Sequence, residues 1–190
     1  MSSKDLIITL PNEHLRRKSQ RVKVITDEVR KVIEIMKAAT LDWEAGREHE
    51  VGVALAAIQI DKAYRIIIVR NNFEDKKDKN FTVLINPEVV KLEGEVEEDY
   101  EGCLSVADIY GKVPRHTKVR IRALNEGGQL IRLRAEGFLA RILQHEVDHT
   151  VGKMFVDYIK DKPDAFFKLT PEGKLESLPY ESLQKNHIFR

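Results

Sequence analysis

The chain has 190 residues, a formal net charge of +1 and a hydrophobic content of 42%, values typical of a globular protein that forms one domain with a sizeable core. This charge gives no electrostatic argument for DNA or a membrane surface as the main partner, and no apolar run approaches the length of a membrane span. The single cysteine, Cys103, excludes an internal disulfide, and the first residues lack the pattern of a signal peptide, so we expect a cytoplasmic location.

A short extended segment and a long helix are expected first. Residues 6–10 are mostly apolar and read as a strand or an extended arm that stops at Pro11. Thr26 is a suitable N-cap, acidic residues follow it, and apolar residues then recur at helical spacing. The pattern therefore predicts a helix from Thr26 to about Gly46.

Two strands and a hairpin are expected in the middle of the chain. Residues 64–69 and 81–85 are rich in β-branched side chains, as buried strands are, and an asparagine–proline pair should stop the second. Residues 118–124 and 129–134 alternate between apolar and polar side chains around the turn Asn-Glu-Gly-Gly, which predicts a β-hairpin. These elements indicate an α+β fold with a mainly antiparallel sheet.

The strongest chemical signal is the sequence His-Glu-Val-Asp-His shortly after the hairpin. On a helix, His145 and His149 lie one turn apart on the same face, where both imidazoles can hold one metal ion. Glu146 follows the first histidine and can handle the proton of an activated water molecule. The pattern also occurs on solvated helices, but here an apolar stripe predicts a half-buried helix. The stripe consists of Phe138, Leu139, Ile142, Leu143 and Val147.

Two histidines rarely complete a metal site, so a third protein ligand is expected. Downstream of the helix, His187 and acids such as Asp157 are candidates. Upstream, Cys103 is the alternative, because a thiolate is a good ligand for zinc or iron. Taken by themselves, the residues leave this choice open.

The end of the chain reads differently from the rest. We expect a single catalytic domain over residues 1–160 and a C-terminal tail over residues 161–190 that is partly helical or disordered. Residues 164–169 read as a short helix, and prolines and a glycine interrupt the remainder of the tail. Such a tail would be dispensable for the chemistry.

Three blocks of the sequence resemble the signature motifs of the peptide deformylases, in that family's order and spacing. They are Gly52–Gln59, Glu101–Ser105 and Gln144–Gly152. The resemblance implies antiparallel sheets packed around a central metal-binding helix. It also implies removal of the formyl group from the initiator methionine of nascent polypeptides, with release of formate. Some family members contact the ribosome through a C-terminal helix, so a transient ribosome contact is expected as well.

The resemblance further implies one ferrous ion per chain, with zinc, nickel or cobalt as substitutes. It assigns as metal ligands Cys103, His145 and His149. Glu146 would then take a proton from water and pass it to the leaving amine. The side-chain amide of Gln59 and the backbone N–H of Leu104 would stabilise the oxyanion that develops.

A substrate site is implied by the same resemblance. Residues 52–54 would form the strand beside the peptide backbone, and Phe138 and Ile142 would line a pocket for the methionine side chain. The stem of Arg141 would lie at the edge of this pocket, and Arg115 near the mouth of the cleft. The full expected set is Gly52, Val53, Ala54, Gly102, Arg115, Phe138, Arg141 and Ile142.

Two residues of the first block depart from the family pattern. Ala54 replaces the second glycine of that motif, and Ile58 replaces the proline before Gln59. These changes favour an alternative hypothesis, a deformylase-like metal-binding protein with reduced or altered activity. Against it, a pure binding protein has no use for Glu146 or Gln59. A third hypothesis is a different metallohydrolase, such as a peptidase.

Overall fold

One seven-stranded antiparallel sheet organises the molecule, as seen in a computed structural model that describes residues 3–185 and 188–189. The strand order is β1-β2-β3-β4-β6-β7, and β5 pairs with β4 beside this path. The strands are β1 (Ala54–Ala56), β2 (Ile66–Arg70), β3 (Phe81–Cys103), β4 (Val106–Leu124), β5 (Leu130–Glu136), β6 (Phe166–Leu169) and β7 (Leu175–Ser177).

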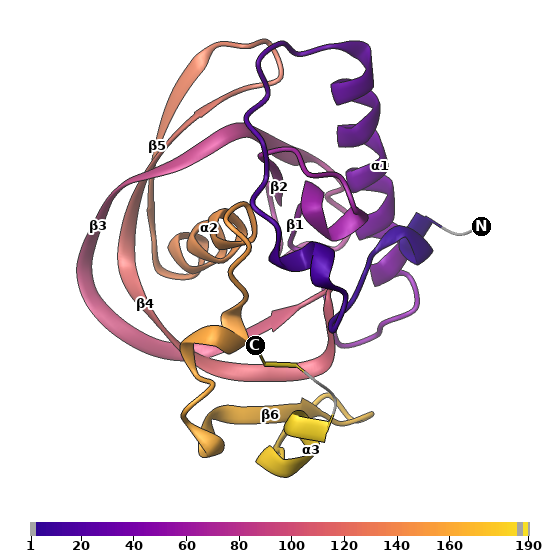
Figure 1. The fold of residues 1–190 in the computed structure, drawn as a ribbon, viewed down its shortest axis with the longest axis vertical. Helices are drawn as coiled ribbons and strands as arrows, with labels where there is room; N and C mark the ends of the chain where they lie inside the picture. Colours follow the sequence, from indigo (N-terminus) through magenta and orange to yellow (C-terminus); the bar gives the residue numbers. More distant parts are fainter. Residues whose placement is uncertain (1–2, 186–187, 190) are drawn as a thin grey trace.

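The helices lie around this sheet, and Figure 1 shows the long strands β3 and β4 curving around α2. The α-helices are α1 (Asp27–Glu44), α2 (Gly137–His149) and α3 (Tyr180–Lys185). Short 3₁₀ helices are η1 (Ser3–Leu6), η2 (Glu13–Arg16), η3 (Ala57–Ile60), η4 (Phe155–Tyr158) and η5 (Pro163–Ala165). The expected α+β fold with a central helix is confirmed. None of the described helices combines the length and apolar content needed to cross a membrane.

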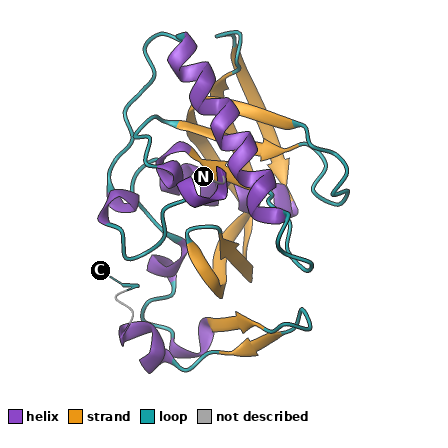
Figure 2. Cartoon of the chain, turned by 90° about the vertical axis from the view of Figure 1, so that its right-hand side faces the viewer, coloured by secondary structure: helices purple, strands orange, loops and turns teal. Residues whose placement is uncertain are grey.

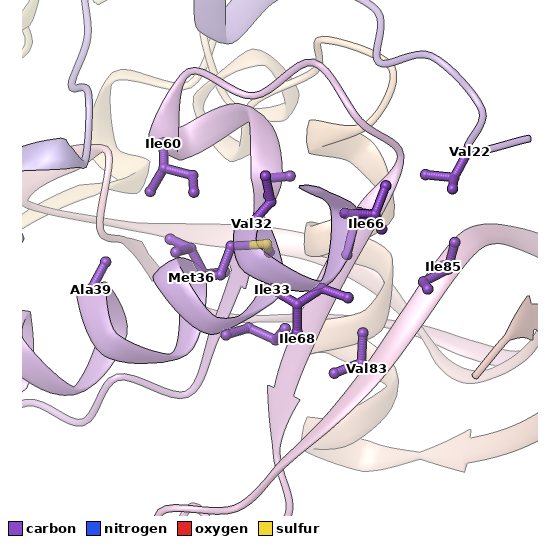
Figure 3. Close-up of a cluster of buried hydrophobic side chains, with 13 residues drawn as sticks. Val22, Val32, Ile33, Met36, Ala39, Ile60, Ile66, Ile68, Val83 and Ile85 are labelled. Carbon is purple, nitrogen blue, oxygen red and sulfur yellow. The ribbon is translucent and has the colours of Figure 1, made fainter. Parts of the chain in front are cut away.

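The first layer is α1, which crosses the sheet (Figure 2) and begins as its sequence predicts. The Thr26 hydroxyl oxygen accepts a hydrogen bond from the N–H of Val29 at 3.4 Å, and the helix ends at Glu44. Its buried face packs against β2 and β3 (Figure 3). Each fully buried aliphatic side chain there contributes about 1.5–3 kcal/mol. The main members of this cluster are Val32, Ile33, Met36, Ile66, Ile68, Val83 and Ile85.

β2 lies between the two long helices, which explains why its first four residues, Ile66 to Val69, are all apolar. Successive side chains of a strand point to opposite faces. Ile66 and Ile68 belong to the cluster around α1, whereas Ile67 and Val69 pack with α2. All residues of β2 are buried. The sheet therefore carries α1 on one face and the histidine-bearing helix on the other.

The expected end of a strand at Asn86-Pro87 is wrong. β3 continues to Cys103, with a register shift between Ile85 and Glu88 where the proline needs no ladder hydrogen bond. Asn86 adopts φ 54°, and its side-chain amide pairs with both backbone groups of Val22 at 2.8 Å. This continuation carries the strand all the way to the cysteine.

The tail also differs from expectation. The predicted helix over residues 164–169 is instead η5 followed by strand β6, which pairs with β4 at its Ile109–Gly111 segment. Residues 166–169 form a strand because this part of β4 offers unpaired backbone groups and a core that buries Phe166 completely. β7 then pairs with β6, and α3 lies beside this hairpin at one end of the molecule (Figure 2).

Candidate metal centre and active site

α2 brings the two histidines onto its buried face. Nε2 of His145 and Nε2 of His149 are 3.1 Å apart, and the Cys103 sulfur at the end of β3 lies 3.4 Å from Nε2 of His149. The three donor atoms all lie within 4.8 Å of one another. Among the open candidates for the third ligand, the structure therefore selects Cys103.

The downstream candidates do not join this cluster. Asp157 accepts a hydrogen bond from the Arg16 guanidinium at 2.5 Å and another from the N–H of Met154 at 2.8 Å, so its carboxylate is used in capping η4. His187 lies outside the described residues.

Glu101 fixes the orientation of the first histidine. Nδ1–H of His145 donates to a Glu101 oxygen at 2.8 Å, which leaves Nε2 as the donor atom that faces Cys103 and His149. Two guanidinium groups hold the same carboxylate: Arg115 from β4 at 2.8 Å and Arg141 from α2 at 2.9 Å. A buried carboxylate needs such partners, because burial without them costs several kcal/mol.

Burial and neighbouring charges shift the pKa values of the two histidines in opposite directions. Burial lowers the pKa of His145, but the Cys103 sulfur and the Glu101 carboxylate outweigh burial and raise it well above its usual value. Burial lowers the pKa of His149 well below its usual value, so this imidazole stays neutral and able to bind a metal. Burial alone would raise the pKa of Glu101, but its contacts with His145 and Arg115 lower it to about 2.

The donor set fits a divalent metal ion. Two imidazole nitrogens and the sulfur of Cys103, the last residue of β3, are ligands suited to zinc or ferrous iron. Cys103, His145 and the neighbouring Glu146 also line a cavity of about 400 Å³, which leaves one side of the cluster open. Three protein ligands with an open side are the arrangement of a catalytic metal site rather than a structural one.

Glu146 lies beside the metal ligands, and one of its carboxylate oxygens makes no hydrogen bond to the described residues. Its side chain lines the cavity, and Oε2 has no hydrogen-bond partner among the described residues. Burial raises the pKa of Glu146 to about 7. A carboxyl group with this pKa can both accept and release a proton near neutral pH.

Gln59 presents its amide N–H₂ to the metal cluster. The backbone N–H of Ala56 donates to Oε1 of Gln59 at 2.8 Å, so Nε2 is the atom that donates to the Ser105 hydroxyl at 3.1 Å and to the Cys103 sulfur at 3.5 Å. The N-terminal arm supports this segment, because the N–H of Ile8 donates to the carbonyl of Gln59 at 2.8 Å. Leu104 follows Cys103 in the turn between β3 and β4 and lines the cavity.

Most of the expected substrate-binding residues line the same cavity. They are Val53, Ala54, Gly102, Phe138, Arg141 and Ile142. Phe138 is 48% exposed and meets the ring of Phe73 edge to face at 5.2 Å, so the two rings form one wall of the cavity. Arg141 contributes its stem, while its guanidinium donates to Glu101 and to backbone carbonyls of β3 and β4.

Two expected substrate-binding residues lie elsewhere. Arg115 is only 4% exposed and is not at the cleft mouth; it binds Glu101 and, at 2.5 Å, Asp148, because a buried guanidinium needs carboxylate partners. Gly52 packs against α1 instead of the cavity, since a Cβ there would lie 2.7 Å from the Thr40 carbonyl oxygen.

Sequence reasoning missed the role of Glu101 and the contributions of Tyr110 and Leu175 to the cavity. A signal for Glu101 was present, because residues i and i+2 of a strand share a face and Glu101 precedes Cys103 by two. No local signal exists for Leu175, whose position depends on the pairing of β6 with β4.

Comparison with known proteins agrees with this geometry. The family model described as polypeptide deformylase matches residues 4–164. A peptide deformylase from Chromohalobacter salexigens is 39% identical over 153 residues, which cover 80% of this chain and 84% of that protein. The crystal structure of a Synechococcus elongatus peptide deformylase in complex with actinonin has a TM-score of 0.74 and 34% identity, covering 82% of this chain and 80% of that one.

A second solved structure extends the match into the tail. The crystal structure of a Legionella pneumophila peptide deformylase has a TM-score of 0.72 and 32% identity, and it covers 96% of this chain and 92% of that one. The sequence match, the fold and the Cys–His–His site thus all indicate the same family. The chain therefore belongs to the polypeptide deformylase family, metal-dependent amide hydrolases that remove the N-formyl group from nascent polypeptides.

Proposed function

We propose that this deformylase acts on N-formyl-methionyl peptides, with Glu146 as the group that moves the proton. The observation that carries this assignment is that Glu146 lines the cavity beside the metal ligands, and that its buried Oε2 has no partner among the described residues. This oxygen is available to accept a proton from an attacking water molecule. With a pKa of about 7, the carboxyl group can then donate that proton to the leaving amine.

Cys103, His145 and His149 would hold the ion, and we propose ferrous iron, with zinc, nickel or cobalt as substitutes. When bound there, a divalent ion lowers the pKa of water and withdraws charge from the formyl carbonyl. The Glu101 carboxylate holds the proton on Nδ1 of His145, so Nε2 of this histidine would be free to bind the ion.

Gln59 and Leu104 are proposed as oxyanion donors. The side-chain Oε1 of Gln59 accepts a hydrogen bond from the N–H of Ala56, so the N–H₂ group of the same amide keeps its direction toward Cys103. A donor fixed in advance stabilises developing negative charge without having to reorganise during the reaction. The backbone N–H of Leu104 adjoins Cys103 in sequence and would supply the second hydrogen bond.

The methionine side chain is proposed to enter between β1 and α2. Val53, Ala54, Phe138 and Ile142 supply apolar lining there, beside the metal ligands. This apolar surface suits an unbranched thioether. Arg141 closes the wall with its stem, while its guanidinium is bound to Glu101 and is unavailable to the substrate.

Location and partners rest on the family alone. We propose that the protein acts in the cytoplasm on chains that emerge from the ribosome, with a transient ribosome contact. Every residue to which we assign a catalytic role lies within residues 1–160, which remains our proposed catalytic domain, with residues 161–190 as its tail.

The alternative of a metal-binding protein with reduced activity loses one of its two arguments. Ile58 is 1% exposed and packs in the apolar cluster of α2, so its difference from the family concerns the core and not the cavity. Ala54 does line the cavity and remains the one residue that favours this alternative.

The proposed role of Glu146 is tested with Glu146→Gln, which keeps the shape of the side chain but cannot carry the proton. We expect an unchanged metal content and a loss of roughly 10² to 10⁴-fold in kcat for formate release. The control is Glu172→Gln, an exposed position in the tail, which should behave like the unaltered protein. A loss of less than about threefold in Glu146→Gln would assign the proton to another group.

A further inference from the structure

The cavity has more lining than formyl-methionine accounts for. The residues proposed above for methionine come from α2 and from β1 with the residue before it, but a second group comes from α1, the loop before β1, the end of β3, the start of β4 and the tail. This second group contains Trp43, His49, Tyr100, Ile109, Tyr110 and Leu175. Because the formyl group ends the peptide, only residues that follow the methionine can extend into the rest of the cavity.

Tyr110 connects this second group to the metal centre. Its ring lies directly against Gly102, where an added Cβ would be 2.6 Å from Cε1 of the tyrosine, and Gly102 adjoins the ligand Cys103. At the other end of the ring, the Tyr110 hydroxyl donates to Oε1 of Glu50 at 2.7 Å. The ring thus forms a fixed wall that runs from beside the metal ligands to the loop before β1.

The tail is attached to this wall. Phe167 of β6 pairs with Tyr110 across the sheet, and its ring meets Tyr100 edge to face at 5.0 Å. The turn between β6 and β7 reaches the loop before β1, because a Cβ on Gly173 would be 2.8 Å from the ring of His49. The tail hairpin and this loop therefore meet beside the cavity, with Leu175 of β7 in its lining.

We propose that Leu175 is a specificity-determining residue of this deformylase. It forms, with Ile109 and Tyr110, an apolar subsite for the side chain of a residue that follows the methionine. Leu175 is half-buried and lines the same cavity as the metal ligands Cys103 and His145. The proposal rests on the proposed function, and it gives the tail a part in substrate selection.

The test compares two substrates within each protein variant, formyl-Met-Leu-Leu and formyl-Met-Gly-Gly. The ratio of their kcat/KM values for formate release does not depend on the amount of active enzyme, so partial misfolding of a variant does not affect it. We expect the unaltered protein to prefer the leucine peptide and Leu175→Ala to lower the ratio about tenfold, mainly through KM, since losing methylene groups from an apolar pocket has at least this effect.

Two controls define the outcome. Leu175→Met should keep the ratio because it restores apolar volume, and Glu176→Ala should keep it because Glu176 is exposed and outside the cavity lining. A ratio within about twofold of the unaltered value in Leu175→Ala, or no preference in the unaltered protein, would overturn the subsite. No formate from either peptide would instead overturn the proposed function beneath it.

Discussion

The helix α2 and the tail over residues 161–190 both contact β4, yet only the first could be understood from its sequence. The two metal ligands of α2 can be predicted from a short stretch of sequence, because histidines four residues apart share a helix face. The tail has no such pattern: β6 is a strand because the Ile109–Gly111 segment of β4 lies beside it. A site made by spacing can be predicted, whereas one made by long-range pairing needs the fold.

The two regions are physically connected. Phe166 of the tail is buried in the same cluster as Phe155, and the Phe155 ring stacks on the His145 imidazole with centroids 6.0 Å apart. The tail therefore contributes to the packing behind a metal ligand. The expectation that residues beyond 160 are dispensable for the chemistry stays a prediction, and this packing gives it measurable consequences.

The largest effect on activity is expected when a metal ligand is changed. Cys103→Ser should lose the metal and all measurable formate release, because a serine hydroxyl does not ionise near neutral pH as a thiol can. Elemental analysis and a formate assay on the same preparation measure both losses. Glu146→Gln is the matched control, since it lies beside the same ligands and should keep the metal. Full metal occupancy in Cys103→Ser would remove the cysteine from the ligand set.

The next effect concerns the tail. Phe166→Ala should lower the free energy of unfolding by about 3–5 kcal/mol, because it leaves a cavity in a core shared with Phe155. Denaturant unfolding measures this loss. The neighbouring Phe167, which is half-buried, is the matched control, and its change to alanine should cost less. A loss below about 1 kcal/mol in Phe166→Ala would mean that the tail is an independent appendage.

The Glu101 carboxylate joins β4 to α2, because its guanidinium partners come from both elements. Its pKa falls from 4.5 to about 2 on folding, so its contribution to stability is complete above pH 4.5 and is lost as the pH falls toward 2. This contribution is on the order of 3 kcal/mol. We expect Glu101→Gln to reduce the slope of unfolding free energy against pH in this window, measured on metal-free protein. Parallel curves for the two proteins would contradict the ion-pair account.

The smallest effect is expected at Ala54, where the chain departs from its family. This residue of β1 pairs with Val69 of β2 and lines the cavity, so we expect its methyl group to lie where the peptide backbone passes. Ala54→Gly should raise kcat/KM on formyl-Met peptides a few-fold with unchanged metal content, against a backbone entropy cost of about 0.5–1 kcal/mol. An equal or lower kcat/KM would show that the methyl group is already accommodated.

Several parts of the fold and site followed from the sequence for local reasons. The N-cap at Thr26, the hairpin of β4 and β5 and the ligand spacing on α2 each depend on residues close together in the chain. The resemblance to the deformylases then added Cys103, which lies 42 residues before His145 (145 − 103) and which no local pattern joins to it. The cluster of donor atoms confirms this ligand set as the metal site.

Other parts could not be predicted because distant residues decide them. The asparagine–proline pair at 86–87 ends many strands, but here the side chain of Asn86 binds Val22 and a bulge lets β3 continue. Arg115 is expected near the mouth of the cleft, but Glu101 and Asp148, which are distant in the chain, bind it in the interior. Each of these outcomes depends on a partner more than ten residues away in the chain.

Formate release from formyl-Met-Ala-Ser tests the central claim most directly. The protein is prepared without oxygen, loaded with ferrous iron and compared with the same preparation after metal removal by a chelator. We expect stoichiometric formate and an intact Met-Ala-Ser peptide, and activity that is lost with the metal and restored by its return. Cleavage of the peptide bond after methionine without formate would instead make the protein a peptidase, and would contradict the account.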